Sequence, residues 1–174
     1  MAEPLPWPAV GSFVAGLISL FFLSYLWSYR DEKGAKYFIG VIGCVTLWTV
    51  SYGVGLLVFD PTLRFLFELP IWLAINGSAV FFLAFAFEYT GRTQAVRSRL
   101  MWGVVGFQLL TTAVISTNPL HRRIWSEYTV SPVAGVAGVA VENEPLLFGI
   151  LLITGMITTA GIVLLADAFA SYGP

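Results

Sequence analysis

The chain has 174 residues, of which 57% are hydrophobic and only 11% are charged, whereas a soluble domain of average composition carries about 25% charged residues. Too few polar side chains are therefore present to cover a soluble fold, and a membrane protein is predicted. The formal net charge is −1 and the basic residues form no long run, so nucleic acid is not an expected partner.

Five apolar segments are long enough to cross a bilayer, because about 20 helical residues cover a hydrocarbon core of about 30 Å. They show no alternation of apolar and polar residues, which favours helices over a β-barrel. The predicted spans are residues 10–29, 37–59, 69–89, 100–117 and 146–170. No basic segment precedes the first span, so it is expected to be a retained anchor and not a cleaved signal peptide. We therefore expect residues 1–174 to form a single all-α membrane domain, a bundle of about five transmembrane helices.

The distribution of basic residues between the connections predicts the orientation of this bundle. Six lie in the connections after spans one and three: Arg30, Lys33, Lys36, Arg92, Arg97 and Arg99. The other three, on the opposite side, are Arg64, Arg122 and Arg123. By the positive-inside rule the N-terminus is outside and the C-terminus is in the cytoplasm. The long connection, residues 118–145, then lies on the outer side.

Asn76, Gln108 and Asp167 are strongly polar residues within the predicted spans. Asn76 and Gln108 lie well inside spans three and four, and Asp167 lies near the inner end of span five. An Asn or Gln in a span commonly hydrogen-bonds a neighbouring helix, which is worth about 0.6 to 2 kcal/mol. Contact with a ligand is the alternative for Asn76 and Gln108, whereas Asp167 is expected at the membrane boundary.

The sequence lacks the residue patterns of several functional classes. Its only lysines, Lys33 and Lys36, lie in a connection, so no span offers a lysine for a retinal Schiff base. Glu68 and Glu88 begin and end one predicted span, about 30 Å apart at 1.5 Å per residue, too far to act as a catalytic pair. The single His121 and single Cys44 form no metal-binding cluster, and no nucleophile elbow or phosphate loop is present. No enzyme activity, cofactor or metal is therefore expected, and a transporter is a distant alternative.

The outer connection holds the only histidine, within the stretch Thr117–Trp125. Pro119 should end the fourth helix, which leaves His121 and the following arginines near the lipid headgroups and Trp125 at the interface. Small and β-branched residues with two glycines, from Ser131 to Val141, favour a short β-hairpin or an extended cap over a helix. The loop is either a solvated cap or part of a ligand site. The candidate ligand-binding residues are Trp72, Asn76, Gln108, Asn118, His121 and Trp125, and in a ligand site they should converge on one outward-opening pocket.

Several segments of the chain carry a resemblance to a known family. They are Trp48 with Tyr52-Gly53, Phe85–Arg92, Thr117–Trp125 with the following Ser-Glu-Tyr-Thr, and Glu144–Phe148. In this order they resemble the N-terminal seven-helix membrane region of certain histidine kinases, a prokaryotic sensor module, from about residue 38 to 174. The positions that carry the family motif are Glu88, Tyr89, Thr90, Gly91, Arg92, Asn118, Pro119 and His121.

The resemblance implies a sensory input module in the cell membrane of a prokaryote. The family continues with two more spans and a cytoplasmic kinase, so the chain is expected to be a fragment or a stand-alone remnant without kinase activity. His121 is not expected to be a phosphoacceptor, because it is placed outside. The expected partners are the lipid bilayer, an unidentified small-molecule signal, and either a second copy of the chain or a protein that supplies the missing helices or the kinase. The alternative is a structural or assembly subunit of the membrane that binds a partner protein.

Overall fold

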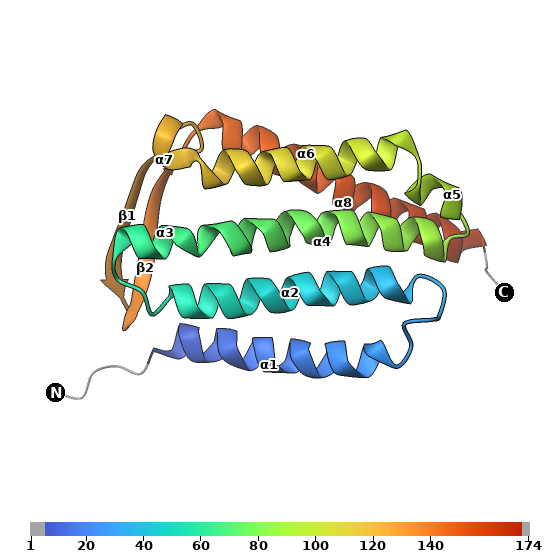
Figure 1. Cartoon of the computed structure of the whole chain (residues 1–174), viewed down its shortest axis with the longest axis horizontal. Helices are drawn as coiled ribbons and strands as arrows, with labels where there is room; N and C mark the ends of the chain where they lie inside the picture. Colours follow the sequence, from blue (N-terminus) through green and yellow to red (C-terminus); the bar gives the residue numbers. More distant parts are fainter. Residues whose placement is uncertain (1–5, 172–174) are drawn as a thin grey trace.

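The computed structural model describes residues 6–171 and consists of five long helices with a small β-hairpin across one end (Figure 1). The long helices are α1 (Trp7–Trp27), α2 (Ala35–Gly55), α4 (Glu68–Tyr89), α6 (Arg99–Ser116) and α8 (Pro145–Ser171). Each is long and apolar enough to cross a membrane, α4 together with the short α3 (Pro61–Leu66) that precedes it. The predicted bundle of five helices long and apolar enough to span a membrane is therefore confirmed.

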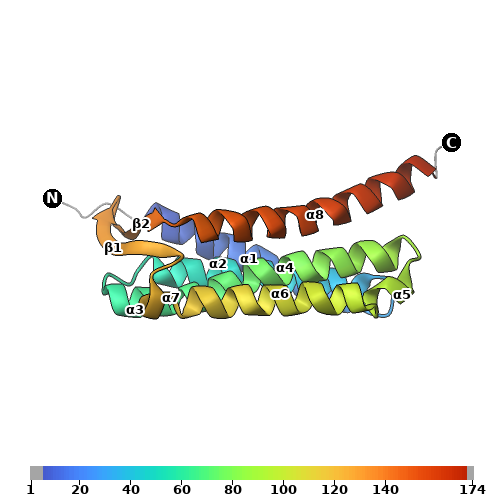
Figure 2. The same ribbon diagram turned by 90° about the horizontal axis from the view of Figure 1, so that it is seen from above.

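Four of the long helices, α1, α2, α4 and α6, lie side by side in chain order (Figure 1). The fifth, α8, lies across one face of this layer (Figure 2). Helix α4 contacts α2, α6 and α8, whereas α6 and α8 touch each other only slightly. Helix α4 is therefore the central element through which the other helices are connected.

Local sequence signals explain where several helices begin. The Asp60 carboxylate accepts a hydrogen bond from the Leu63 N–H at 2.8 Å, and Pro61 occupies the first helical position of α3. The Ser98 hydroxyl accepts a hydrogen bond from the Met101 N–H in the same way at the start of α6. Such caps satisfy backbone donors that have no partner within the helix. The short α5 (Thr93–Val96) fills the connection between α4 and α6.

A β-hairpin and the four-residue α7 (Asn118–His121) cover the end of the bundle where α3 begins, which we call the hairpin end. Strand β1 (Trp125–Val133) pairs antiparallel with β2 (Val136–Asn143). Of the two predicted alternatives, a hairpin or an extended cap, the structure has the hairpin, and it is longer than the Ser131–Val141 stretch that suggested it. The Ala137 N–H donates to the Leu56 carbonyl at 2.7 Å, so the hairpin reaches from α7 to the end of α2.

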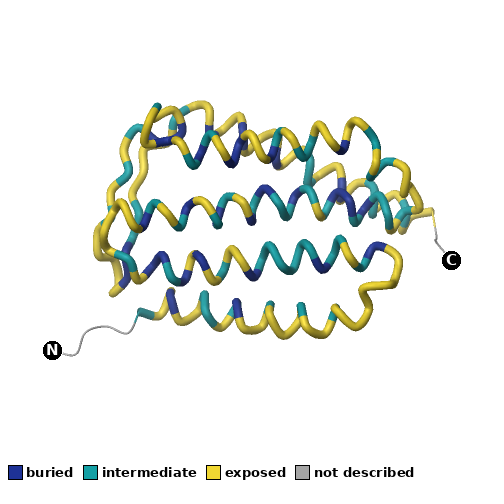
Figure 3. The backbone as a smooth tube through the Cα atoms, viewed as in Figure 1, coloured by how far each residue is buried: buried dark blue, intermediate teal, exposed yellow. Residues whose placement is uncertain are grey.

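The surface of the bundle is apolar along most of its length, and much of the burial lies on the faces that the helices turn toward one another (Figure 3). In α1 only Ala9 and Gly16 are buried, and large side chains such as Phe21 and Leu17 face outward. Outward-facing apolar side chains are compatible with lipid and not with water. The burial pattern agrees with a bundle surrounded by a bilayer.

The left-handed backbone conformation of the hairpin turn can be tested by a substitution. Ala134 and Gly135 have φ angles of 49° and 78°, the left-handed pair that a two-residue type I′ turn requires. Because a Cβ is disfavoured there, Ala134→Gly is expected to stabilise the protein by about 0.5–1 kcal/mol. The measurement is thermal unfolding of the purified chain in detergent. Ala140→Gly, in the middle of β2, is the matched control and should not stabilise; equal gains from both variants would contradict the turn assignment.

Candidate functional site

Aromatic side chains from α3, α4 and β1 gather at the hairpin end. The Trp72 and Trp125 ring centroids are 6.1 Å apart, and those of Phe65 and Tyr128 are 5.4 Å apart. Trp125 is only 5% exposed and packs with the buried Ile115, so it lies inside the protein and not at the lipid interface as expected. The structure therefore brings two of the candidate residues, Trp72 and Trp125, into one cluster.

A buried ion pair lies beside this aromatic cluster. The Arg64 Nη1 donates to Glu68 Oε1 at 3.0 Å, and the two side chains are 3% and 11% exposed. The Tyr128 hydroxyl donates to the same carboxylate oxygen at 3.2 Å. Residues 64, 68 and 128 thus join α3, α4 and the hairpin through one polar contact, which we call the Arg64–Glu68–Tyr128 cluster.

The surroundings of this cluster keep the Tyr128 hydroxyl protonated and hold Arg64 in place. Burial, together with the neighbouring Glu68 carboxylate, raises the pKa of the Tyr128 hydroxyl above its ordinary value, so Tyr128 remains a neutral hydrogen-bond donor. The Arg64 guanidinium lies against the last residue of α2, where a Cβ added to Gly55 would stand 3.0 Å from Arg64 Cζ. A cation is favoured at the C-terminal end of a helix because the dipole is negative there.

Sequence reasoning missed this cluster as a site. In the sequence, Arg64 stands out only as one of three basic residues on the predicted outer side. Glu68 stands out only as one of two glutamates that are too far apart to act as a catalytic pair. A signal was nevertheless present, because Arg64 and Glu68 are four residues apart and would face each other in any helix that included both. The participation of Tyr128, 60 residues further along the chain, had no local signal.

Asn118 and His121 hold the short connection between α6 and β1. The Asn118 side chain accepts from the N–H groups of Ile124 and Trp125 at 2.9 and 3.2 Å and donates to the Trp125 carbonyl at 3.0 Å. The His121 ring contacts the Val114 carbonyl through Nε2 at 3.0 Å and accepts from the Arg123 N–H through Nδ1 at 3.0 Å. These partners assign the proton to Nε2. Both side chains are thus engaged with the backbone of the loop.

Asn76 and Gln108 form a second polar group, deep between the helices. The Asn76 Nδ2 donates to the hydroxyls of Thr112 and Thr111 on α6 at 2.8 and 3.1 Å. The Gln108 Nε2 donates to the Thr154 hydroxyl on α8 at 3.3 Å. This network joins α4, α6 and α8 by the interhelical hydrogen bonds that the sequence predicted as the common use of such residues. Among the residues described, Asn76 Oδ1 is buried without a hydrogen-bond partner.

The six candidate ligand-binding residues therefore occupy three environments. Trp72 and Trp125 are in the aromatic cluster, Asn118 and His121 stabilise the adjoining loop, and the remaining two lie in the interhelical network. Asn118 and Trp125 both line the hollow at the hairpin end, and neither of the two hollows described below is lined by all six residues. Binding of a ligand by these residues stays a prediction.

The family-motif stretch Glu88–Arg92 lies at the opposite end of the bundle, which we call the α5 end. Helix α4 ends at Tyr89, and Gly91 takes the left-handed conformation with φ 82°. Arg92 pairs with Asp167 of α8 at 3.5 Å, with side chains 48% and 66% exposed. An ion pair this exposed contributes little to stability, but it connects the ends of α4 and α8.

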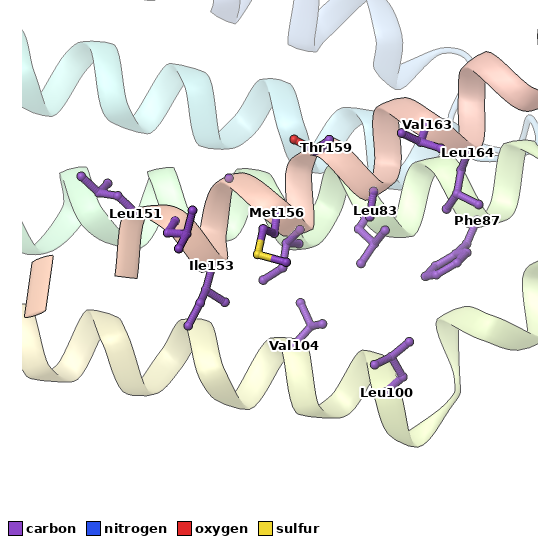
Figure 4. Close-up of a pocket in the computed structure, with 14 residues that line it drawn as sticks. Leu83, Phe87, Leu100, Val104, Leu151, Ile153, Met156, Thr159, Val163 and Leu164 are labelled. Carbon is purple, nitrogen blue, oxygen red and sulfur yellow. The ribbon is translucent and has the colours of Figure 1, made fainter. Parts of the chain in front are cut away.

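Two of the hollows on the surface of residues 6–171 are large enough to consider. One, of about 840 Å³, lies at the hairpin end between α3, α7 and β1. The other, of about 1070 Å³, is an apolar groove between α4, α6 and α8 (Figure 4). Leu83 of α4, Val104 of α6 and Met156 of α8 line this second groove. Among the described residues no group of three or more His, Cys, Asp or Glu side chains could hold a metal ion.

Comparison with known proteins assigns the chain to a family. No curated protein and no solved structure matches the chain. Residues 12–173 match the family described as the N-terminal 7TM region of histidine kinase, so the match covers nearly the whole chain, and the predicted resemblance is confirmed. The chain therefore belongs to the family of N-terminal seven-transmembrane regions of histidine kinases.

Proposed function

We propose that the chain is a membrane-embedded sensory module that receives a signal at the hairpin end and transmits it to the α5 end. The observation that carries this proposal is the sequence of polar contacts along α4. The Arg64–Glu68–Tyr128 cluster lies at its start, the Asn76 network lies further along, and the Arg92–Asp167 pair lies at its end. A change in the hairpin therefore has a physical route to the opposite end of the bundle.

The orientation that we propose places the hairpin outside the cell and the α5 end in the cytoplasm. The connection between α1 and α2 and the connection through α5 lie at the same end (Figure 1). Six of the nine basic residues lie in these connections or in the first two residues of the helices that follow them, and the hairpin end carries Arg64, Arg122 and Arg123. The positive-inside rule supports an outer hairpin and an N-terminus outside. The sensory family supports localisation in the cell membrane of a prokaryote.

Transmission requires that a signal favours one of two arrangements of the helices, since a ligand shifts an equilibrium only by its difference in affinity for the two states. Helix α8 is suited to such a change. It contacts α4 but touches α6 only slightly, and the Gln108–Thr154 hydrogen bond links it to α6. We propose that movement of the hairpin shifts α4 and so alters the position of α8 at the α5 end.

This route can be tested without a known ligand, by removing a contact of the hairpin. Spin labels are placed at the α5 end with Gln94→Cys and Ala170→Cys in a Cys44→Ala background, and the distance between them is measured by pulsed electron resonance in nanodiscs. Tyr128→Phe removes the hydroxyl that binds Glu68 and is expected to broaden or shift this distance distribution.

Ser131→Ala is the matched control, because Ser131 is an exposed β1 residue. It should leave the distances unchanged. If Tyr128→Phe also leaves them unchanged while hydrogen exchange shows that the hairpin has loosened, the proposed transmission is wrong.

The second candidate function is that of a structural subunit that binds partner helices. The observation that favours it is the apolar groove between α4, α6 and α8, since the family description names seven transmembrane helices and the described residues contain five helices long enough to span. A second copy, further helices of the same polypeptide or a kinase subunit could fill this groove. A hairpin that loosens without effect at the α5 end would favour this function over the sensory one.

A further inference from the structure

The hollow at the hairpin end lies where the spanning helices end. Its lining comes from α3, from the last residue of α6, from the α7 segment and from residues 125–129. Helix α3 belongs to the same apolar spanning segment as α4, so the hollow lies beside the end of a span. Two leucines in the lining, Leu66 and Leu120, are 62% and 86% exposed. In a bundle that crosses a bilayer, side chains at this level meet the boundary between acyl chains and headgroups.

A strip of exposed leucines leads from the hollow toward the middle of the bundle. It consists of Leu66, Leu69 and Leu73 on α3 and α4 and Leu109 on α6, and we call it the leucine strip. Phe67, between α3 and α4, keeps the helical angles φ −76° and ψ −15°, so the first three leucines, at helical spacing, share one face. Leu109 lies about two turns of α6 from Ser116, which lines the hollow. An acyl chain that enters the bilayer beside the hollow therefore meets apolar side chains of both helices.

Arg122 is the cation of this hollow. Its side chain lines the space and forms no salt bridge within the described part of the chain. The Arg122 N–H donates to the Asn118 carbonyl at 2.8 Å, and the backbone takes the left-handed φ of 51°, so the chain from which the guanidinium extends is fixed. A guanidinium offers several parallel N–H donors and binds phosphate oxygens in pairs. A phosphate at the membrane boundary is thus the natural counter-ion of Arg122.

Glu127 places a negative charge in the same lining. Among residues 6–171 its carboxylate has no salt-bridge partner either. A carboxylate disfavours a second negative charge beside it and favours a cationic group that can donate hydrogen bonds. The lining therefore suits a ligand that carries both a phosphate and an ammonium group, and the leucine strip suits an apolar tail on the same ligand.

We propose that this hollow holds the headgroup of a phospholipid with a primary ammonium, such as phosphatidylethanolamine. The phosphate binds Arg122, the ammonium is attracted to Glu127, and an acyl chain lies along the leucine strip. The volume of about 840 Å³ is within the range of about 300–1,000 Å³ typical of small-ligand sites. Phospholipid is favoured over a soluble ligand because the charged lining and the apolar strip follow each other from the membrane boundary inward, as headgroup and acyl chain do. The proposal requires only that the helices span a bilayer, and it does not rest on the sensory function.

The test uses photo-crosslinking of a lipid to the full chain in phosphatidylcholine nanodiscs. The probe is phosphatidylethanolamine with a diazirine midway along one acyl chain, added as a minor component, and the labelled positions are mapped by mass spectrometry. Labelling is expected on the leucine strip. The exposed face of α1, with Val14 and Leu17, reports contact with bulk lipid and is the internal reference. A strip that is labelled no more than α1 would overturn the proposal.

Variants of two neighbouring arginines sharpen this test. Arg122→Gln removes the cation and should lower the ratio of strip to α1 labelling by about tenfold, the effect of one charge-assisted hydrogen bond. Arg122→Lys should retain most of the labelling. Arg123→Gln is the matched control, because Arg123 is exposed and does not line the hollow. An unchanged ratio in Arg122→Gln, or an equal loss in Arg123→Gln, would contradict a specific phosphate contact.

Competition with unlabelled compounds identifies the headgroup. Phosphatidylethanolamine should displace the probe from the leucine strip more effectively than phosphatidylglycerol does, and Glu127→Gln should remove this difference. If phosphatidylglycerol competes equally well with the wild type, an anionic lipid occupies the hollow and the proposed ammonium contact is wrong. Displacement by inorganic phosphate would assign the hollow to a soluble anion and overturn the lipid proposal.

The outcome is separable from that of the proposed function. Lipid labelling reports occupancy of the hollow, and the distance between the spin labels at the α5 end reports transmission. Specific labelling of the strip, together with an unchanged distance in Tyr128→Phe, would leave the lipid site standing and reject transmission. Labelling no stronger than that of α1, together with a distance change in Tyr128→Phe, would reject the lipid site alone.

Discussion

Replacement of Glu68 by Ala is expected to lower the stability of the bundle by about 3–5 kcal/mol, the cost of leaving one partner of a buried ion pair uncompensated. Arg64 and Glu68 are 3% and 11% exposed, so water cannot replace the lost partner. The substitution also removes the acceptor of the Tyr128 hydroxyl, which should loosen the hairpin. The measurement is unfolding of the detergent-solubilised chain, followed by circular dichroism and by tryptophan fluorescence.

The exposed ion pair at the α5 end provides the control. Asp167→Ala removes the partner of Arg92, but both side chains are largely exposed, so a change below about 1 kcal/mol is expected. The double variant Arg64→Met with Glu68→Met should recover most of the loss, because apolar side chains of similar size can replace a buried pair. A Glu68→Ala variant as stable as the Asp167→Ala variant would show that the pair is not buried in the membrane-embedded protein.

Asn118→Ala is expected to release the connection between α7 and β1 and to destabilise it by about 2–4 kcal/mol, since leaving a buried polar group unpaired costs about 1–3 kcal/mol. The substitution removes three hydrogen bonds from one buried side chain. Two of them satisfy the N–H groups of Ile124 and Trp125, which are 0% and 5% exposed. Hydrogen exchange at these two amides is the direct measurement, and both should become much less protected.

Asn143→Ala is the matched control, because Asn143 is an exposed residue at the end of β2. It should leave the Ile124 and Trp125 amides protected. Asn118→Asp keeps an acceptor for both N–H groups but loses the donor to the Trp125 carbonyl, so it should fall between the wild type and Asn118→Ala. Unchanged protection in Asn118→Ala would show that another group holds the loop.

Asn118 shows that a residue of a family motif can stabilise the loop in which it lies. Asn118, Pro119 and His121 were expected as motif positions, and Asn118 and His121 also as ligand contacts. In the structure the Asn118 and His121 side chains bind the backbone of their own loop. A motif residue that stabilises a loop sets the positions of the side chains that the loop carries, here Arg122 and Trp125.

The hydrophobic composition of the chain and the succession of its apolar segments were sufficient to predict the bundle. A chain that crosses a lipid bilayer must form a long apolar helix at each crossing. The five spanning helices, the hairpin and the family resemblance all followed from local patterns in the sequence. Asn76 and Gln108 were also identifiable as interhelical residues, since a polar amide within a span needs a partner. Which helix supplies that partner was not readable from the sequence.

Only the tertiary structure decided how the functional groups are combined. Tyr128 reaches Glu68 across 60 positions of sequence, and Asn76 meets Thr112 of α6, because the packing of α4 against α3, α6 and the hairpin turns these faces together. The rotation of a helix about its axis and the choice of its neighbours depend on side-chain packing summed over the whole bundle. Hydropathy reports that a segment is buried in the membrane, but it does not report which side chain each residue will meet.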